Sequence, residues 1–444
     1  MSLFGAIDTA ISGLTSQSAA FGNISENVAN SQTTGFKRVN TNFTDYLTTS
    51  TQTVNEPGSV VATPSYVNNV QGAITQTSNP LGMAIAGQGF FAVSQATGQV
   101  NSAPTFNPQQ FYTRAGNFTM NANGYLVNGT GQYLNGWSVN PATGVANQNA
   151  LAPIQVSQST YNPVATTNVT LSANLPATPA TGTATAASPL SSQITVYDAL
   201  GTAHSVTLNW TQNAANNWTV KVAVPDSTTG TTDAGSANVQ FGTVSGNPVP
   251  QGTIGQVSVS TTDPGTVSTT GYAAGQPATL QFTTNFGSGN QTIQVNVGNY
   301  GGTTGVTQYA GSAYSLLGLT QNGVPPGSFS GVTAQANGNV VVNYNNGQTR
   351  TIAQIPIVTF NAPNALQNQN GQSFTATQNS GTPLAEAAGT NGAGNLVIGS
   401  IEGSNVDIAT EFSALIVAQQ AYSSNAKVVS TASQMLQSTL QMVA

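Results

Sequence analysis

The stretch SNVDIATEFSALIVAQQAYSSNAKVVSTASQMLQSTLQMVA (residues 404–444) contains neither Gly nor Pro. Its apolar and small residues recur at alternating steps of four and three, which is the spacing of one continuous face on an α-helix. We therefore predict a long C-terminal helix, opened by an S-x-x-D capping box at Ser404 and Asp407. Its packing seam comprises Ile408, Phe412, Leu415, Gln419, Tyr422, Ala426, Val429, Ser433, Leu436, Leu440 and Val443.

The same spacing recurs at the N-terminus, where it predicts a second helix from Ser2 to about Ala29, ended by the turn-forming residues 30–35. All 21 prolines lie between Pro57 and Pro383, so the two helices enclose a body that Pro and Gly interrupt. The N-terminal seam comprises Phe4, Ile7, Ile11, Leu14, Ser18, Phe21, Ser25 and Val28.

The body is predicted to consist of short β-strands. Residues 118–127 form one expected hairpin, since Asn123-Gly124 supplies the positive φ angles of a tight turn. Residues 194–210 form a second, with its turn at 198–201, whereas residues 36–75 look extended and irregular. The predicted fold is mostly β, with paired, coiled-coil-like terminal helices and nested β domains inserted between them.

Because the two ends pair, each inner segment is an insertion into the one outside it. We expect four layers: a terminal helical domain from 1–30 and 404–444, an extended linking layer from 31–75 and 361–403, an inner β domain from 76–155 and 346–360, and one or more outer β domains in 156–345.

Charged residues are rare in this chain. Asp, Glu, Lys and Arg make up 4% of the residues, where about 25% is ordinary. The formal net charge is −6 and Lys37-Arg38 is the only adjacent basic pair, which argues against nucleic-acid binding. There is no cysteine, so thiolate sites are excluded. The N-terminus has the pattern of neither a cleaved signal peptide nor a membrane span.

No constellation of residues indicates catalysis, a cofactor or a metal. Residues 87–92 match G-x-G-x-x-A, but strand-forming residues follow where a dinucleotide site needs a helix, so we interpret them as a turn. His204 is the single histidine and is interpreted as a plain strand residue. Arg114 stands alone in an uncharged region; exposure is the simpler interpretation, and pairing with a domain or subunit neighbour is the alternative.

The positions that flank the C-terminal seam point to assembly. They hold Ala, Ser, Gln, Asn and Thr, where a two-stranded coiled coil in water usually carries Glu and Lys. Ala414, Ala418, Ala421 and Ala432 allow neighbours to approach closely. We therefore predict that the helix is enclosed on several sides by other subunits.

Four motifs closely resemble those of the flagellar rod and hook axial proteins. They lie in residues 27–37, 86–91, 112–126 and 402–427. The residues that carry the likeness are Asn27, Asn30, Thr34, Gly35, Phe36 and Lys37; Gly87, Gly89, Phe90 and Phe91; Arg114, Gly116 and Asn117; and Ser404, Asn405, Val406 and Asp407.

Within that family the hook branch is favoured. Residues 195–201 with His204 are similar to an outer-domain motif of hook proteins, and residues 360–366 to the segment that returns to the inner domain. The resemblance implies a non-enzymatic subunit of an extracellular, flexible helical polymer that acts as a universal joint, exported by the flagellar type III route without a cleaved signal. Implied partners are the subunit itself, the hook cap, distal rod, hook–filament junction and hook-length control proteins, and the export apparatus. The alternatives are another axial protein or a secreted β-rich adhesin.

Overall fold

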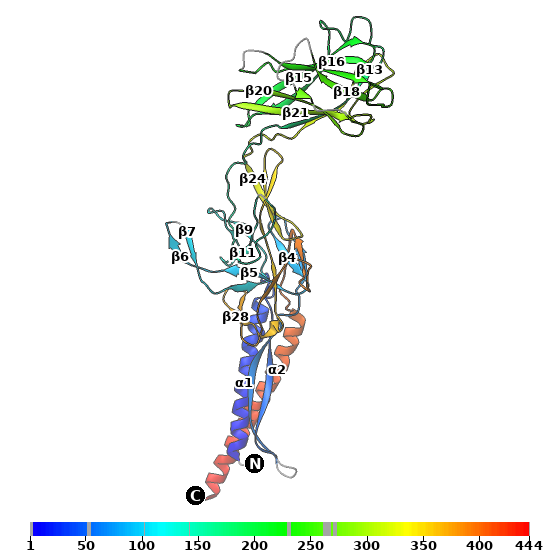
Figure 1. Cartoon of the computed structure of the whole chain (residues 1–444). Helices are drawn as coiled ribbons and strands as arrows, with labels where there is room; N and C mark the ends of the chain where they lie inside the picture. The colour runs from blue at the N-terminus through cyan, green and yellow to red at the C-terminus, as the bar shows by residue number, and fades with distance from the viewer. Residues whose placement is uncertain are drawn as a thin grey trace. The chain divides into compact units, whose positions relative to one another are not determined.

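The computed structural model describes residues 3–50, 55–101, 103–141, 143–228, 232–260, 268–269 and 273–443. The chain forms two compact units. Unit 1 comprises residues 1–158, 330–343 and 349–444, and unit 2 comprises residues 159–329 and 344–348. The fold is mostly β with a long helix at each end, as the sequence predicts (Figure 1).

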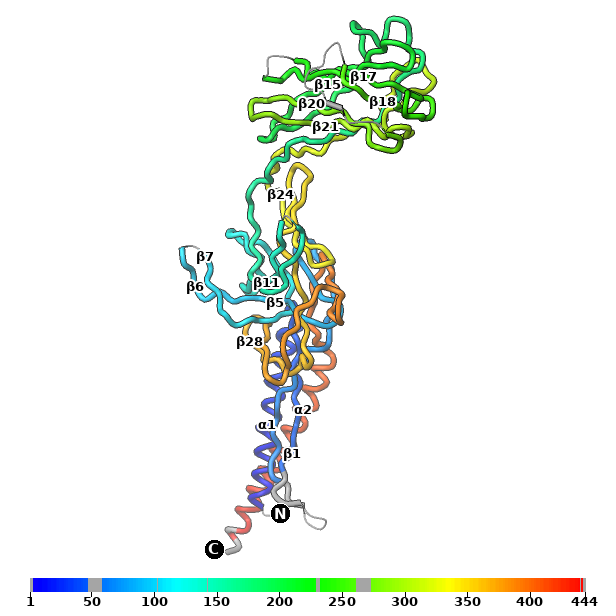
Figure 2. Tube along the Cα trace, in the orientation of Figure 1, coloured from blue at the N-terminus to red at the C-terminus, as the bar shows by residue number. Residues whose placement is uncertain are grey.

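The two helices of unit 1 are α1 (Leu3–Ala29) and α2 (Ile408–Val443). They run antiparallel and pack side by side, together with a hairpin of two long strands, β1 (Val39–Ser50) and β2 (Asn55–Tyr66) (Figures 1 and 2). This hairpin corrects the expectation of an irregular segment at 36–75. Pro64 does not interrupt it, because a two-stranded ladder has open edges where a missing N–H is tolerated.

The rest of unit 1 is built of short strands. A 13-stranded sheet has the main order β24-β25-β26-β11-β5-β8-β29-β28, and β3–β32, β4–β31 and β6–β7 form separate ladders. The bounds are β3 Ile74–Gln76, β4 Met83–Ala86, β5 Phe90–Ser94, β6 Ala96–Val100, β7 Ala103–Phe106, β8 Phe111–Thr113, β9 Thr119–Met120, β10 Leu126–Val127, β11 Tyr133–Ser138, β12 Ala152–Pro153, β24 Phe329–Ala334, β25 Asn339–Tyr344, β26 Thr349–Gln354, β27 Ile357–Thr359, the 3₁₀ turn Pro363–Ala365, β28 Gln367–Gln369, β29 Ser373–Thr375, β30 Leu384–Glu386, β31 Asn395–Ile398 and β32 Ser400–Glu402.

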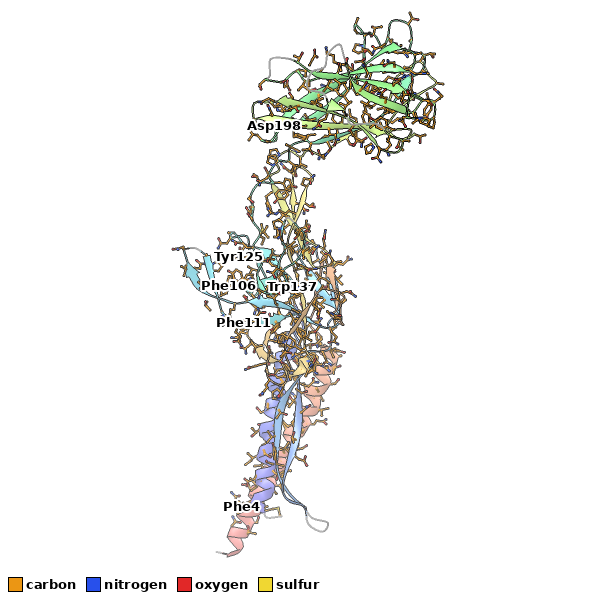
Figure 3. The ribbon with its side chains drawn as sticks, viewed as in Figure 1. Phe4, Phe106, Phe111, Tyr125, Trp137 and Asp198 are labelled. Atoms are coloured by element: carbon orange, nitrogen blue, oxygen red, sulfur yellow. The ribbon has the colours of Figure 1, made fainter. Side chains whose placement is uncertain are left out.

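Aromatic side chains form the core of this sheet. The whole of β5 is buried; Phe91 meets Phe118 edge-on at 5.5 Å and Phe90 meets Phe374 at 5.6 Å. Near the β6–β7 ladder, Phe106 packs on Tyr125 (6.0 Å), a contact that can be followed in Figure 3. The predicted hairpin at 118–127 is confirmed as β9–β10.

Unit 2 contains two sheets that share one apolar core. One is antiparallel, in the order β14-β15-β16-β17-β18; the other has the order β19-β20-β21-β13-β22, with β23 also paired to β13. The predicted hairpin at 194–210 is confirmed as β14–β15. The bounds are β13 Asn168–Pro176, β14 Leu190–Tyr197, β15 Ala203–Ala214, β16 Asn217–Ala223, β17 Asp233–Phe241, β18 Ile254–Val259, β19 Ser268–Thr269, β20 Pro277–Asn285, β21 Asn290–Asn299, β22 Val306–Tyr309 and β23 Ser315–Gln321.

The unit boundaries differ from the expected layers at both ends of the outer body. Residues 156–158 belong to unit 1 and residues 346–348 to unit 2, and residues 330–343 belong to unit 1 rather than to the outer body expected at 156–345. The reason is strand pairing: β24 and β25 extend the sheet through β26, which pairs with β11 at Trp137–Gln354.

Candidate functional site

The paired terminal helices are the candidate assembly surface. Phe21 of α1 meets Tyr422 of α2 with 6.1 Å between ring centroids. Nearer the N-terminus of α1, Gly13 makes room for Asn425: a Cβ at Gly13 would lie 2.7 Å from the Asn425 amide nitrogen. The two helices therefore approach closely where one of them lacks a side chain.

The row of α2 that is covered in the protomer only partly coincides with the predicted seam. Burial recurs at steps of three and four from Glu411 to Leu436. Ile408 and Phe412 lie beside this row and are exposed. Small residues occupy both of these adjacent helix faces, so the same three-and-four spacing describes either face. The covered or half-covered positions are Glu411, Leu415, Ala418, Ala421, Asn425, Val429, Ala432 and Leu436; Leu440 and Val443 lie on α2, but their side chains are outside the described part.

The N-terminal seam is likewise only partly covered. Phe4 is 66% exposed and Ile11 47%; Phe4 is labelled in Figure 3 near the N-terminal end of α1. Large apolar side chains in water disfavour an isolated subunit and favour contact with a partner. The remaining apolar seam residues, Ile7, Leu14, Phe21 and Val28, are half-buried, whereas the seam residues Ser18 and Ser25 are exposed.

The first motif ends α1 and anchors the β1–β2 hairpin. The buried Asn27 side chain binds Val39 twice: its amide donates to the Val39 carbonyl and its oxygen accepts the Val39 N–H, both at 2.9 Å. Gly35 has φ +71°, and a Cβ there would lie 2.4 Å from the backbone nitrogen of Ala115. Glycine at 35 therefore lets the first motif touch the third. Asn30 and Thr34 are half-buried, while Phe36 and Lys37 are buried.

A buried ionic cluster joins three of the four motifs. Glu402, whose side chain is fully buried, accepts a hydrogen bond from Lys37 Nζ on Oε1 (2.5 Å) and from Arg114 Nη1 on Oε2 (2.9 Å). Its Oε1 also accepts the Gly72 N–H at 2.9 Å. Only 6 basic and 12 acidic residues occur in the chain, and three of them meet here. Exposure of Arg114, the simpler interpretation from the sequence, is therefore wrong.

Backbone carbonyls accept further hydrogen bonds from both cations, although the buried Arg114 Nε has no partner. Lys37 Nζ donates to Val70 O at 2.7 Å, and Arg114 donates from Nη1 to Ile85 O (3.1 Å) and from Nη2 to Gly87 O (2.7 Å). The Arg114 guanidinium also lies 5.3 Å from the centre of the Phe90 ring. These bonds reduce the cost of burying the charges.

Burial lowers the pKa values of the two cations, Lys37 and Arg114. The pKa of Lys37 is lowered by burial; attraction to Glu402 opposes this shift, and repulsion from Arg114 adds to it. Burial also lowers the pKa of Arg114, against the attraction of Glu402. Arginine nevertheless stays protonated in proteins. The Glu402 carboxylate is therefore the negative charge that offsets the buried positive charge of this cluster.

The second motif is a glycine turn that leads into a strand. Gly87 and Gly89 have φ +105° and +119°, and a Cβ on Gly89 would lie 2.2 Å from Ile357 Cγ2. The chain continues as β5 with Phe90 and Phe91 buried. The motif therefore allows a close approach between segments and positions the carbonyl of Gly87 for Arg114.

In the third motif, Gly116 packs against the strand β4. A Cβ on Gly116 would lie 1.7 Å from the Met83 carbonyl oxygen. Gly82, the residue before Met83, forms a β-bridge with Asn117. No larger residue fits at 116 without moving the backbone. This contact fixes the strand that carries Ile85, one of the carbonyl partners of Arg114.

The fourth motif leads from the cluster into α2. Asn405 Oδ1 accepts the Arg38 N–H at 2.7 Å, and its amide donates to Val67 O and Val70 O, both at 3.1 Å. Ser404 Oγ accepts the N–H of Val406, two residues on, and not that of Asp407 among the described contacts. The expected capping box is therefore wrong: Asp407 itself is the cap, because the helix begins at Ile408.

Asp407 gives α2 a testable pH dependence. Its Oδ1 accepts from the backbone N–H groups of Thr410 (3.4 Å) and Ala409 (2.9 Å), and these bonds lower the pKa of Asp407. The stabilisation is present above the unfolded-state pKa, about 4, and is lost as the pH falls through the lower folded-state pKa. We expect the wild-type monomer to lose helical circular dichroism in that window. Asp407→Asn keeps an acceptor at every pH and should not show this loss; identical acid profiles would contradict the cap.

In unit 2, the outer-domain motif forms a buried polar contact. Asp198 Oδ1 accepts the N–H groups of Thr202 (2.7 Å) and Leu200 (2.9 Å), and Asp198 Oδ2 lies 3.6 Å from His204 Nε2. Burial alone would raise the pKa of Asp198, but these hydrogen bonds lower it. The His204 ring stacks on Phe286 at 4.0 Å. The motif thus closes the β14–β15 turn.

The described residues contain neither a metal-site cluster nor a membrane-spanning helix. No group of three or more His, Asp or Glu side chains that could hold a metal ion occurs among them. Within the same described part, neither helix is apolar enough to cross a membrane.

Three family profiles match the chain. "Flagellar hook protein FlgE/F/G D1 domain" matches residues 84–174, "Flagellar basal body protein FlaE D2 domain" matches 166–324, and "Flagellar basal body rod FlgEFG protein C-terminal" matches 398–442. Together they span well over half of the sequence.

Relatives align along nearly the whole chain. Flagellar hook protein FlgE of Brucella suis is 29% identical over 442 residues, with 98% of each chain covered. FlgE of Escherichia coli is 29% identical over 453 residues, covering 97% of this chain and 98% of that one. A crystal structure of Helicobacter pylori FlgE2 superimposes with a TM-score of 0.45 at 15% identity, covering 72% of this chain and 98% of the other. From the profiles and the full-length relatives, the chain belongs to the flagellar hook protein family.

Proposed function

We propose that this chain polymerises through its terminal helices into the hook of the bacterial flagellum, a flexible tube that transmits torque from rod to filament. The observation that carries the proposal is the α1–α2 pair, which leaves Phe4, Ile11 and Phe412 exposed in the single subunit. The family is a structural hook family and not an enzyme family, so the proposed activity is assembly.

The layered organisation of the tube is part of the proposal. Residues 1–30 and 404–444 would form the inner tube, with 31–75 and 361–403 as the linking layer. Residues 76–155 and 346–360 would form an inner β domain, and the remainder outer β domains. Compatible with this, the buried cluster at Glu402 ties the linking segments to the inner β domain.

The proposed partners follow from the place of a hook between rod and filament. Besides other copies of itself, the subunit would meet the distal rod protein, the hook–filament junction protein, the hook cap, the hook-length control protein and the flagellar export apparatus. Export would proceed without a cleaved signal peptide, to the outside of the cell. Full-length similarity to hook proteins favours neither of the alternatives, which are another axial protein such as a distal rod or junction subunit, and a secreted β-rich adhesin.

Electron microscopy of the purified assembly tests the proposal. We expect short curved tubes from cells that produce this chain, and their loss from a deletion strain that then fails to swim. Straight rods would instead assign the chain to another axial position. Isolated globules at concentrations at which hooks form would contradict assembly altogether.

A further inference from the structure

A groove runs between α1 and β2 within unit 1. It has a volume of about 320 Å³. One wall carries Ser12, Thr15, Ser16 and Ala19 of α1, and the other carries residues 59–62 of β2. Every one of these side chains is small or β-branched and uncharged. A groove of this kind has room for larger side chains from a partner.

The hydroxyl groups on the α1 wall of the groove, those of Ser12, Thr15 and Ser16, already have hydrogen-bond partners in the protomer. Ser16 Oγ donates to Val60 O at 2.8 Å, and Ser12 Oγ accepts the Val60 N–H at 3.1 Å. Thr15 Oγ1 donates to Ile11 O at 3.0 Å. A partner therefore need not supply hydrogen bonds, and apolar side chains can enter without leaving these groups unsatisfied.

An apolar ridge of matching character lies on α2. Ile408, Phe412 and Ile416 follow one another at steps of four, so they stand in one row on the helix surface. They are 44%, 52% and 56% exposed. The row contains no charged residue. The ridge therefore offers large apolar side chains, whereas the groove is lined by small ones.

Within one subunit the ridge lies too far along the helices to fill the groove. Gly13 is level with Asn425, as their close approach shows. Because the helices are antiparallel, Phe412 is level with roughly residue 26 of α1, whereas the groove centres near Ser16. That separation is about ten residues, or about 15 Å at 1.5 Å per residue.

We infer that the groove of one subunit receives the Ile408–Phe412–Ile416 ridge of a second copy, displaced by about 15 Å along the helix axis. The inference rests on the proposed polymerisation and identifies one of its contacts. Each subunit offers one groove and one ridge, which are different surfaces. Such a head-to-tail contact propagates from copy to copy instead of closing into a dimer.

Disulfide cross-linking tests this contact cleanly, because the chain has no cysteine of its own. We would introduce Ala19→Cys and Phe412→Cys together, assemble tubes, oxidise them and separate the products without reductant. A disulfide needs Cα atoms about 4.4–6.8 Å apart. We expect a ladder of dimers and larger multimers, since every subunit carries both halves of the contact. Mixed tubes of the two single variants should give dimers only.

The matched control pairs Phe412→Cys with Ser18→Cys, an exposed neighbour of Ala19 that does not line the groove. This pair should give no ladder. Ala19→Cys would also be paired with Ile416→Cys. If tubes form but neither this pair nor the pair with Phe412→Cys yields a ladder, the inference is overturned. A cross-link within the free monomer would also overturn it, because the chain's own ridge would then be the occupant.

A second variant keeps the inference testable if the double cysteine chain does not assemble. Ala19→Phe fills the groove, so we expect at least a tenfold loss of tubes with an unchanged melting temperature of the monomer. Normal tubes from Ala19→Phe would overturn the contact while leaving the hook function intact. Failure of the unmodified chain to form tubes would instead refute the proposed function.

Discussion

Glu402→Gln is expected to destabilise unit 1 by about 3–5 kcal/mol, the usual cost of removing one partner from a buried ion pair. The substitution keeps the shape of the side chain but leaves Lys37 and Arg114 without a counter-ion. Both cations stay buried, at 3% and 2% exposure, so water cannot replace the lost carboxylate. The change should also weaken the contact between the three chain segments that carry Lys37, Arg114 and Glu402.

Calorimetry of the monomer measures this effect, because the two compact units are expected to give separable transitions. The transition of unit 1 should fall strongly, while that of unit 2, which contains none of the cluster, should stay in place. Glu26→Gln is the matched control: it removes an exposed carboxylate from α1 and should change stability by less than about 0.5 kcal/mol.

A double-mutant cycle distinguishes charge from shape at this cluster. Lys37→Met combined with Glu402→Gln leaves one buried cation instead of two, so we expect it to recover part of the loss caused by Glu402→Gln alone. Strict additivity of the two single variants would mean that Lys37 and Glu402 do not interact. A Glu402→Gln chain as stable as the Glu26→Gln control would contradict the cluster itself.

The sequence predicts local features of this fold well because local chemistry determines them. The absence of Gly and Pro after Ser404 leaves a helix as the favoured structure, and Asn123-Gly124 specifies its turn whatever surrounds it. The pairing of Lys37 with Glu402 spans 365 positions in the chain. No spacing rule relates such residues, so only the motif likeness indicated that they matter.

The structure corrects one expectation and shows that one helical spacing fits more than one face. Residues 36–75 are expected to be irregular, but they contain the β1–β2 hairpin, because strand edges that face no neighbour tolerate proline. On α2 the 3–4 spacing fits two adjacent faces, since Ala and Ser occupy both. The fold covers the face with Leu415 and Val429 and leaves Ile408 and Phe412 exposed. Which face is covered depends on α1, not on α2 alone.

Leu415→Asp should abolish assembly and motility. Leu415 is half-buried on the row of α2 that is covered in the protomer, and the buried Glu411 lies one turn before it. The variant would therefore place a second carboxylate four residues after the first, where like charges repel, and burying it without a partner costs several kcal/mol. The tube would repeat that cost in every subunit.

Two substitutions at the same position separate the causes. Leu415→Met keeps an apolar side chain of similar volume and should assemble normally. Leu415→Asn is polar without the charge, so its defect should be smaller than that of Leu415→Asp. Tube yield by sedimentation and swimming in soft agar are the measurements, with the melting transition of unit 2 as the folding control, since Leu415 belongs to unit 1. Normal tubes from Leu415→Asp would show that this row is not enclosed, whereas loss of the unit 2 transition would show that α2 supports the folding of the whole chain.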